Sequence, residues 1–285
     1  MLSMSSYKNI INKFPVVLYC LTAFSITWGL KLIYFSVKSR YGMPLFNFGL
    51  ISSFGPSISA LILIYATEGK DGFKRIFKKL TDWNVGIKWI LLATFFEPIM
   101  FGIITLGYWL VYGGFPVPDA FSVFLDVTSY TGTFIAGLFL WGLSEEIGWR
   151  GWMLPKLQGG MSPLSASLIL AVIASLWHIN PNLFSEILVS KEGAYLYGFF
   201  PEIVERLFIS IPFTMVITYI FNKTSGSLLL MMSFHSASNT SYFWIDGVFG
   251  IVKSDFFRIS FTITLIIIAI VFTVMLIRQR KKVTS

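Results

Sequence analysis

The sequence predicts an all-α fold: a polytopic membrane protein with about eight transmembrane helices that enclose an intramembrane polar site. Three observations predict it. Of the 285 residues, 55% are hydrophobic and only 13% are charged, and the mean hydropathy is +0.73. A soluble domain has about twice that charged fraction, roughly 25%. Apolar stretches long enough to cross a bilayer recur along the chain, yet several of them contain charged residues or histidines.

Eight stretches are expected as transmembrane helices, because each approaches the roughly 20 apolar residues that a spanning helix needs. They cover residues 15–36, 44–66, 89–112, 129–153, 163–180, 201–221, 227–245 and 257–277. The first is expected to be retained rather than removed as a signal peptide, because its apolar run exceeds a signal core. The sequence has no internal repeat and no long linker. Residues 1–285 are therefore predicted to form one integral membrane domain, with a motif-bearing core at about 129–245.

The distribution of Lys and Arg predicts the orientation of the chain in the membrane. Six basic residues lie in the second connection, between 70 and 88, whereas residues 113–128 contain none. Both termini are therefore expected in the cytoplasm, with Lys38 and Arg40 as exceptions to the rule. The formal net charge of +8 matters less in a membrane protein than the positions of these charges. The expected partner is the lipid bilayer of the cell membrane, and no nucleic acid is expected.

The segment FKRIFKKL, residues 73–80, has apolar residues at helical spacing: Phe73, Ile76, Phe77 and Leu80. With basic residues between them, this pattern favours a short amphipathic helix on the inner leaflet. A solvated basic loop is the alternative interpretation.

The segment EEIGWR places Glu145, Glu146 and Arg150 inside the fourth apolar stretch. Charged residues within a membrane usually face the protein interior and serve a function. On a helix Glu146 and Arg150 are at i and i+4 and can pair, whereas Glu145 is turned by about 100°. The pattern therefore predicts a structural ion pair and a second glutamate that is free for chemistry. The alternative is that all three are helix-end charges at the water interface.

Both histidines of the chain, His178 and His235, lie in apolar stretches, and Asn239 follows His235 at i+4 on the same helical face. Either histidine alone is more often a hydrogen-bonded core residue than a catalyst. Together with a free glutamate, they form a set that can activate water and stabilise an oxyanion.

These motifs resemble those of the CPBP family, the CAAX proteases and bacteriocin-processing enzymes, which includes the type II CAAX prenyl endopeptidases. EEIGWR matches the family's EExxxR motif, FHSASN (234–239) matches FHxxxN, and His178 occupies the histidine of FxxxH. Ala174 departs from the family, since phenylalanine is usual at that position. The similarity in motif order and span pattern extends from about residue 50 to 245.

The resemblance implies a role for each motif residue. Glu145 would be the general base that activates water, assisted by His178, while His235 and Asn239 would stabilise the oxyanion. Glu146 and Arg150 would support the site. The implied activity is intramembrane hydrolysis of a peptide or membrane-protein substrate near the cytoplasmic face.

The sequence favours a metal-independent mechanism with no cofactor. It contains no HExxH motif, and the single cysteine, Cys20, removes Cys-based metal sites. Zinc remains the alternative, because Glu145, His178 and His235 are the three protein ligands that a catalytic zinc needs.

Two other functions are compatible with the sequence. One is a non-catalytic bacteriocin-immunity or partner-binding protein on the same fold, since a fold alone does not fix function. The other is a transporter with a proton relay, against which the lack of an internal repeat counts. Glu97, in the third stretch and outside the family motifs, is expected to line the cavity or to carry protons.

Overall fold

A computed structural model describes residues 11–41, 48–116, 127–179 and 196–279, and every regular element in these ranges is a helix. The predicted all-α class is therefore confirmed. The elements are α2 (Pro15–Tyr41), α3 (Phe48–Ser52), α4 (Gly55–Leu80), α5 (Ile87–Tyr112), α7 (Val127–Gly137), η1 (Leu138–Leu143), α8 (Ser144–Gly148), η2 (Trp149–Met153), α9 (Leu154–Gly160), α10 (Pro163–His178), α12 (Leu196–Lys223), α13 (Leu228–Trp244), η3 (Ile245–Phe249) and α14 (Asp255–Ile277).

Within the described ranges, four helices are long and apolar enough to cross a membrane. They are Pro15–Tyr34, Ile87–Tyr112, Pro201–Lys223 and Asp255–Ile277, and α10 is a shorter apolar helix of 16 residues. The protein is thus a multi-pass membrane protein. The count of eight stays a prediction, because the other expected spans correspond to helices that are short, broken or rich in polar residues.

The second expected span, 44–66, begins at residues outside the described ranges and continues as α3 and α4. Helix α4 extends to Leu80, with a kink at Gly69, where φ is +62°. Residues 73–80 are therefore helical, and the loop interpretation of FKRIFKKL is wrong. Their apolar side chains do not share one environment, since Ile76 is buried in the core and Phe77 is exposed.

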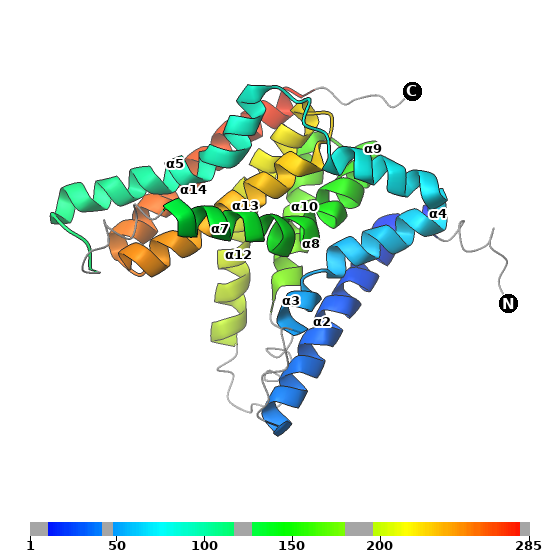
Figure 1. Cartoon of the computed structure of the whole chain (residues 1–285), viewed down its shortest axis with the longest axis horizontal. Coiled ribbons are helices and arrows are strands. Elements are labelled where there is room, and N and C mark those ends of the chain that lie inside the picture. The colour runs from blue at the N-terminus through cyan, green and yellow to red at the C-terminus, as the bar shows by residue number, and fades with distance from the viewer. Residues whose placement is uncertain (1–10, 42–47, 117–126, 180–195, 280–285) are drawn as a thin grey trace.

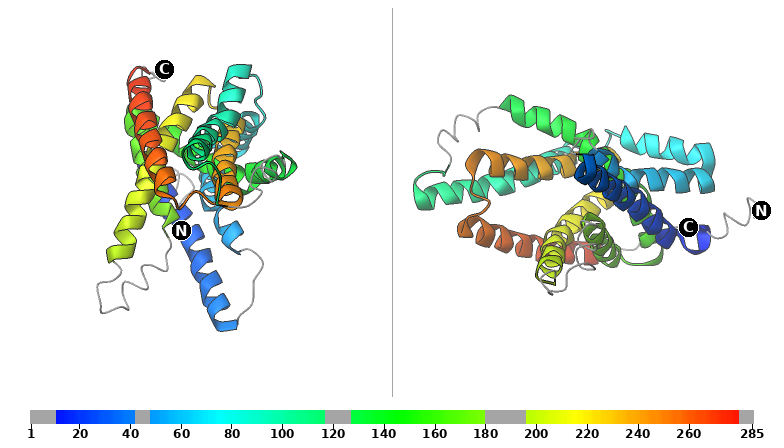
Figure 2. Two further views of the ribbon diagram at one scale, coloured as in Figure 1. Left: turned by 90° about the vertical axis from the view of Figure 1, so that its left-hand side faces the viewer. Right: turned by 90° about the horizontal axis from the view of Figure 1, so that it is seen from below.

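The helices pack around the segment that carries the two adjacent glutamates. Figure 1 shows α2 and α4 at one end of the molecule and α5 and α14 at the other, with α8, α10, α12 and α13 between them. Figure 2 shows the same arrangement from two further sides. Helix α8 packs against α4 and α13, α10 packs against α12, and α13 packs against α5. Every residue from Ser144 to Leu154 is buried.

Two π-helical turns, η1 and η2, flank α8 in the fourth expected span. A π turn holds one more residue than an α turn and is frequent at functional sites, because it changes the direction of the side chains around it. The glutamates therefore lie on a single α-helical turn between two such turns.

A close approach of three helices fixes the position of α8. A Cβ atom added at Gly148 would overlap with the Tyr19 hydroxyl of α2 and with the Pro56 carbonyl of α4. The Ser57 hydroxyl of α4 also donates a hydrogen bond of 2.8 Å to the Leu143 carbonyl. Only glycine at position 148 allows α8 to pack this closely.

Serine N-caps set the start of the two helices that carry the histidines. The Ser162 hydroxyl accepts a hydrogen bond from the Ser165 amide at the start of α10, and Ser227 accepts one from the Leu230 amide at the start of α13. Such caps satisfy amides that would otherwise be unpaired, which stabilises a helix by about 1 kcal/mol.

Candidate active site

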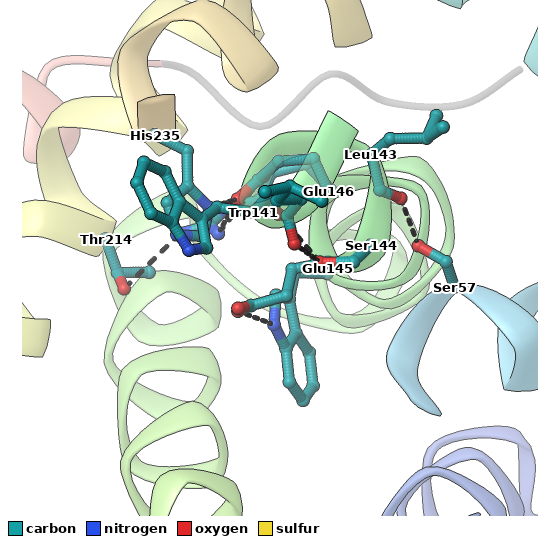
Figure 3. A network of polar contacts seen from close by, with 11 residues as sticks. Ser57, Trp141, Leu143, Ser144, Glu145, Glu146, Thr214 and His235 are labelled. Atoms are coloured by element: carbon teal, nitrogen blue, oxygen red, sulfur yellow. Dashed lines mark hydrogen bonds and ion pairs between the residues drawn. The ribbon is translucent and has the colours of Figure 1, made fainter. Parts of the chain in front are cut away.

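Glu146 lies at the centre of a buried polar network (Figure 3). Its Oε1 atom accepts a bond of 2.9 Å from Nη1 of Arg150 and lies 2.7 Å from Nδ1 of His235. Glu146 has no exposed surface, and the side chains of its two partners are at most 9% exposed. The ion pair that the i, i+4 spacing predicts is present, and it is extended by a histidine from α13.

The contact with Glu146 fixes how the ring of His235 is protonated. A carboxylate that pairs with arginine is ionised and can only accept, so Nδ1 of His235 carries a proton in this bond. The Nε2 atom is then the position from which the ring can act on a substrate. Phe213 of α12 contacts the His235 ring at 5.5 Å between centroids and lies 5.6 Å from the Arg150 guanidinium.

Glu145 points away from this network and has a different partner. Its Oε2 atom accepts a hydrogen bond of 3.1 Å from the indole Nε1 of Trp149, one turn later. The Glu145 side chain is buried, and its charge interacts with both His178 and His235. The two adjacent glutamates are thus held by different residues.

Aromatic packing positions Trp149. Its ring makes edge contacts with Tyr19 at 5.6 Å and with Trp177 at 5.8 Å between centroids. Trp177 in turn lies edge-on to the ring of His178 at 4.7 Å, and its own indole donates to the Thr27 hydroxyl at 2.9 Å. Helix α2 therefore supports both Glu145 and His178 through tryptophans.

His178 is the last residue of α10 and is partly buried. Its Nδ1 atom lies 2.7 Å from the Ala174 carbonyl, which can only accept, so Nδ1 carries the proton. Nε2 of the neutral ring is then an acceptor, the form that a base requires. Ala174, at the position where phenylalanine is usual, is buried beneath it.

Asn239 lies one turn after His235 on α13 and lines a cavity of about 540 Å³ between α5, α12, α13 and α14. Phe213 lines the same cavity and also contacts the His235 ring, so the cavity adjoins the buried network. Among the described residues, the structure joins Glu145 to Trp149 and Glu146 to Arg150 and His235, while Asn239 lines the cavity.

A comparison with protein families matches the segment that carries all of these motifs. Residues 127–241 match the family model described as "Type II CAAX prenyl endopeptidase Rce1-like". This segment contains Glu145, Glu146, Arg150, His178, His235 and Asn239. Because of this similarity, the matched segment, residues 127–241, is called the Rce1-like domain.

A curated relative extends the similarity beyond this domain. The "CAAX prenyl protease 2" of Methanococcus maripaludis is 27% identical over 245 residues, which are 82% of this chain and 84% of the relative. The family model and this relative both agree with the resemblance that the three motifs carry. The similarity to this relative therefore extends to residues outside 127–241.

Across the described ranges, no three His, Cys, Asp or Glu side chains form a group that could hold a metal ion. Glu145 is bonded to Trp149, and Nδ1 of each histidine is bonded to another group.

Sequence reasoning missed the two contacts that position the candidate catalytic groups. Trp149 lies at i+4 from Glu145, the same spacing that predicted the pair of Glu146 with Arg150, so a local signal for it exists. The bond between Glu146 and His235 joins residues 89 positions apart and has no local signal.

Proposed function

We propose that this Rce1-like protein is an intramembrane endopeptidase in which Glu145 activates a water molecule to hydrolyse a peptide bond. The observation that carries the proposal is the separation of the two glutamates. Glu146 pairs with Arg150 and is bonded to His235, whereas Glu145, among the described residues, is bonded to the Trp149 indole alone and lies within electrostatic reach of both histidines.

In the proposed reaction, Glu145 takes a proton from water as the water oxygen attacks the carbonyl carbon. His178, with its Nε2 lone pair, accepts a hydrogen bond from the same water and orients it. The carbonyl oxygen becomes an oxyanion, to which His235 and Asn239 donate. Glu145 then passes its proton to the leaving nitrogen as the carbon–nitrogen bond breaks.

Glu146 gives His235 the protonation state that this role requires. Because Nδ1–H is bonded to Glu146, the ring donates to an oxyanion only if Nε2 is also protonated. The carboxylate of Glu146 stabilises that imidazolium, as a carboxylate does for histidine in hydrolytic triads. Glu146 and Arg150 thus act as positioning residues and do not touch the substrate.

We propose a peptide or a membrane protein as the substrate and a cleavage site near the cytoplasmic face. The curated relative is named for prenylated CAAX substrates; the composition of this chain, rich in Phe, Ile and Lys, is typical of bacteria, where a peptide precursor is the more expected substrate. The basic second connection supports cytoplasmic termini.

The proposal is tested by comparing the peptidomes of cells that carry the wild type and Glu145→Gln. The amide is isosteric but cannot act as a base. We expect peptides that depend on the wild-type protein to disappear, while the variant is present in the membrane at a normal level. Glu68→Gln, which changes a carboxylate on the surface of α4, is the matched control. An unchanged peptidome would favour a non-catalytic immunity protein on the same fold.

We also propose that hydrolysis needs no metal. A strong chelator should leave the turnover of the purified protein intact, and the protein should contain far less than one zinc per chain. His235→Gln should retain some activity, because loss of one oxyanion donor costs about 10²–10³-fold rather than all activity. Stoichiometric zinc that is lost together with activity in this variant would overturn the metal-independent mechanism.

A further inference from the structure

Glu97 is a buried carboxyl that the proposed mechanism does not use. It lies on α5, outside the Rce1-like domain, and only 7% of its surface is exposed. No hydrogen bond or ion pair between described residues includes it, yet it lines the cavity of about 540 Å³. A buried carboxyl without a partner is costly, and in a membrane protein such a residue generally has a function.

Aromatic rings form much of the cavity wall around this carboxyl. Phe101 lies one turn after Glu97 on α5, Phe213 belongs to α12, and Tyr242 and Phe261 belong to α13 and α14. The faces of aromatic rings attract cations, and an apolar wall also accommodates the methylene groups of a long side chain. A carboxyl among aromatic rings is therefore suited to a positively charged group on an apolar stem.

The charged residues on α12 give the cavity an acidic character. Glu202, Glu205 and Arg206 all line it, so with Glu97 the lining has three carboxyl groups and one guanidinium. These three residues are more exposed than Glu97, which places them on the accessible side of the cavity. This excess of acidic groups attracts cations and disfavours anions.

Asn239 connects the cavity to the proposed reaction, since it lines the same cavity and is proposed to donate to the oxyanion. We propose that the cavity is a subsite that binds a basic side chain of the peptide substrate, with Glu97 as the partner of its cationic group. The identity of the ligand as a peptide side chain rests on the proposed function. The binding of a cation does not.

Cation binding is tested first, without any need for hydrolysis. The protein is purified in neutral maltoside micelles, and binding of benzylammonium and of its neutral analogue benzyl alcohol is measured by calorimetry. We expect the wild type to prefer the cation at least about tenfold and Glu97→Gln to lose this preference, because a buried cation would be left without its partner. If the wild type and Glu97→Gln prefer benzylammonium over benzyl alcohol to the same degree, the proposal is overturned.

Two further variants keep this test independent of any effect of Glu97→Gln on folding. Arg206→Gln changes an exposed side chain and removes the one cation of the lining, so benzylammonium should bind severalfold more tightly. Asp71→Asn, at a side chain that is 90% exposed outside the cavity, should leave the affinity unchanged. Weaker binding in Arg206→Gln would contradict an acidic cation site.

The source of the cationic group is tested with a peptide library and with lipid. The wild type should cleave peptides with Lys or Arg at one fixed position from the scissile bond, and Glu97→Gln should lose this selectivity. Cleavage by the wild type without a preference for Lys or Arg would overturn the subsite. Competition by added phosphatidylethanolamine would assign the site to a lipid amine instead. No cleavage, together with cation binding that depends on Glu97, would refute the proposed hydrolysis and leave only the cation site.

Discussion

At the scale of single residues, the two adjacent glutamates differ because successive residues of a helix point in different directions. Glu146 points toward Arg150 and His235, and Glu145 points toward Trp149. The pair with Arg150 was predictable, because i, i+4 neighbours on a helix meet whatever the fold. The contact with His235 was not, because it depends on how α8 and α13 pack.

The hydrogen bond from Trp149 is expected to position Glu145 for catalysis. Trp149→Phe keeps an aromatic ring between Tyr19 and Trp177 but removes the indole N–H. Because a hydrogen bond to a charged group contributes about 1.5–3 kcal/mol, kcat should fall roughly tenfold or more, with KM little changed. Steady-state kinetics on a cleaved peptide provide the measurement.

The matched control is Trp152→Phe. Trp152 is equally buried and stacks on Tyr19, but its indole N–H has no hydrogen-bond partner among the described residues. This substitution should leave kcat close to that of the wild type. Equal losses in the two variants would show that ring packing, and not the bond to Glu145, determines activity.

Arg150→Ala should cost stability as well as activity. It would leave the buried carboxylate of Glu146 with only His235 as a partner, and removing one member of a buried ion pair costs about 3–5 kcal/mol. The amount of folded protein after membrane extraction should fall strongly. A stable variant with normal activity would contradict the supporting role of the pair.

At the scale of elements, the helices were predictable where apolar content and local signals agree. The expected stretch 227–245 corresponds to α13, which a serine caps, and 257–277 lies within α14. The stretch 129–153 was predicted as a single span but consists of α and π turns. Composition does not encode these turns, and it does not encode the close approach of Gly148 to α2 and α4 either.

Helix α2 is expected to support the site through α10, although it lies outside the Rce1-like domain. The Thr27 hydroxyl accepts from the Trp177 indole and donates to the Ser52 carbonyl at 2.8 Å. Thr27→Val keeps the shape but leaves both groups unpaired, which costs about 1–3 kcal/mol for each buried group. The midpoint of thermal unfolding and kcat should both fall, because Trp177 packs on His178.

Thr22→Val provides the control for this prediction. The Thr22 hydroxyl bonds only to carbonyls of its own helix, those of Leu18 and Tyr19, among the described contacts. Its loss should leave the unfolding midpoint and kcat nearly unchanged. If both threonine variants behave alike, the contact between α2 and α10 does not support the site.

At the scale of the whole molecule, the sequence predicted the membrane class and one polar site, but not how the site is divided. Glu146 and His235 are joined in a buried network, whereas Asn239 and Glu97 line a cavity to which Phe213 also contributes. Sequence spacing places residues along helices, and only packing decides whether each one lies in the network or at the cavity. Glu97 was expected to line a cavity, and it does.

The orientation of the molecule in the membrane is the prediction that decides on which face the site opens. Lys74 and Asp255 have side chains that are 80% and 92% exposed, and they belong to connections expected on opposite faces. In a Cys20→Ser background, Lys74→Cys should react with an impermeant thiol reagent only after the cells are opened. Asp255→Cys should react in intact cells, because the basic residues between 70 and 88 favour the cytoplasm for the connection that holds Lys74. The reverse pattern would place both termini outside and move the proposed cleavage site to the outer face, while the contacts within the site would remain as they are.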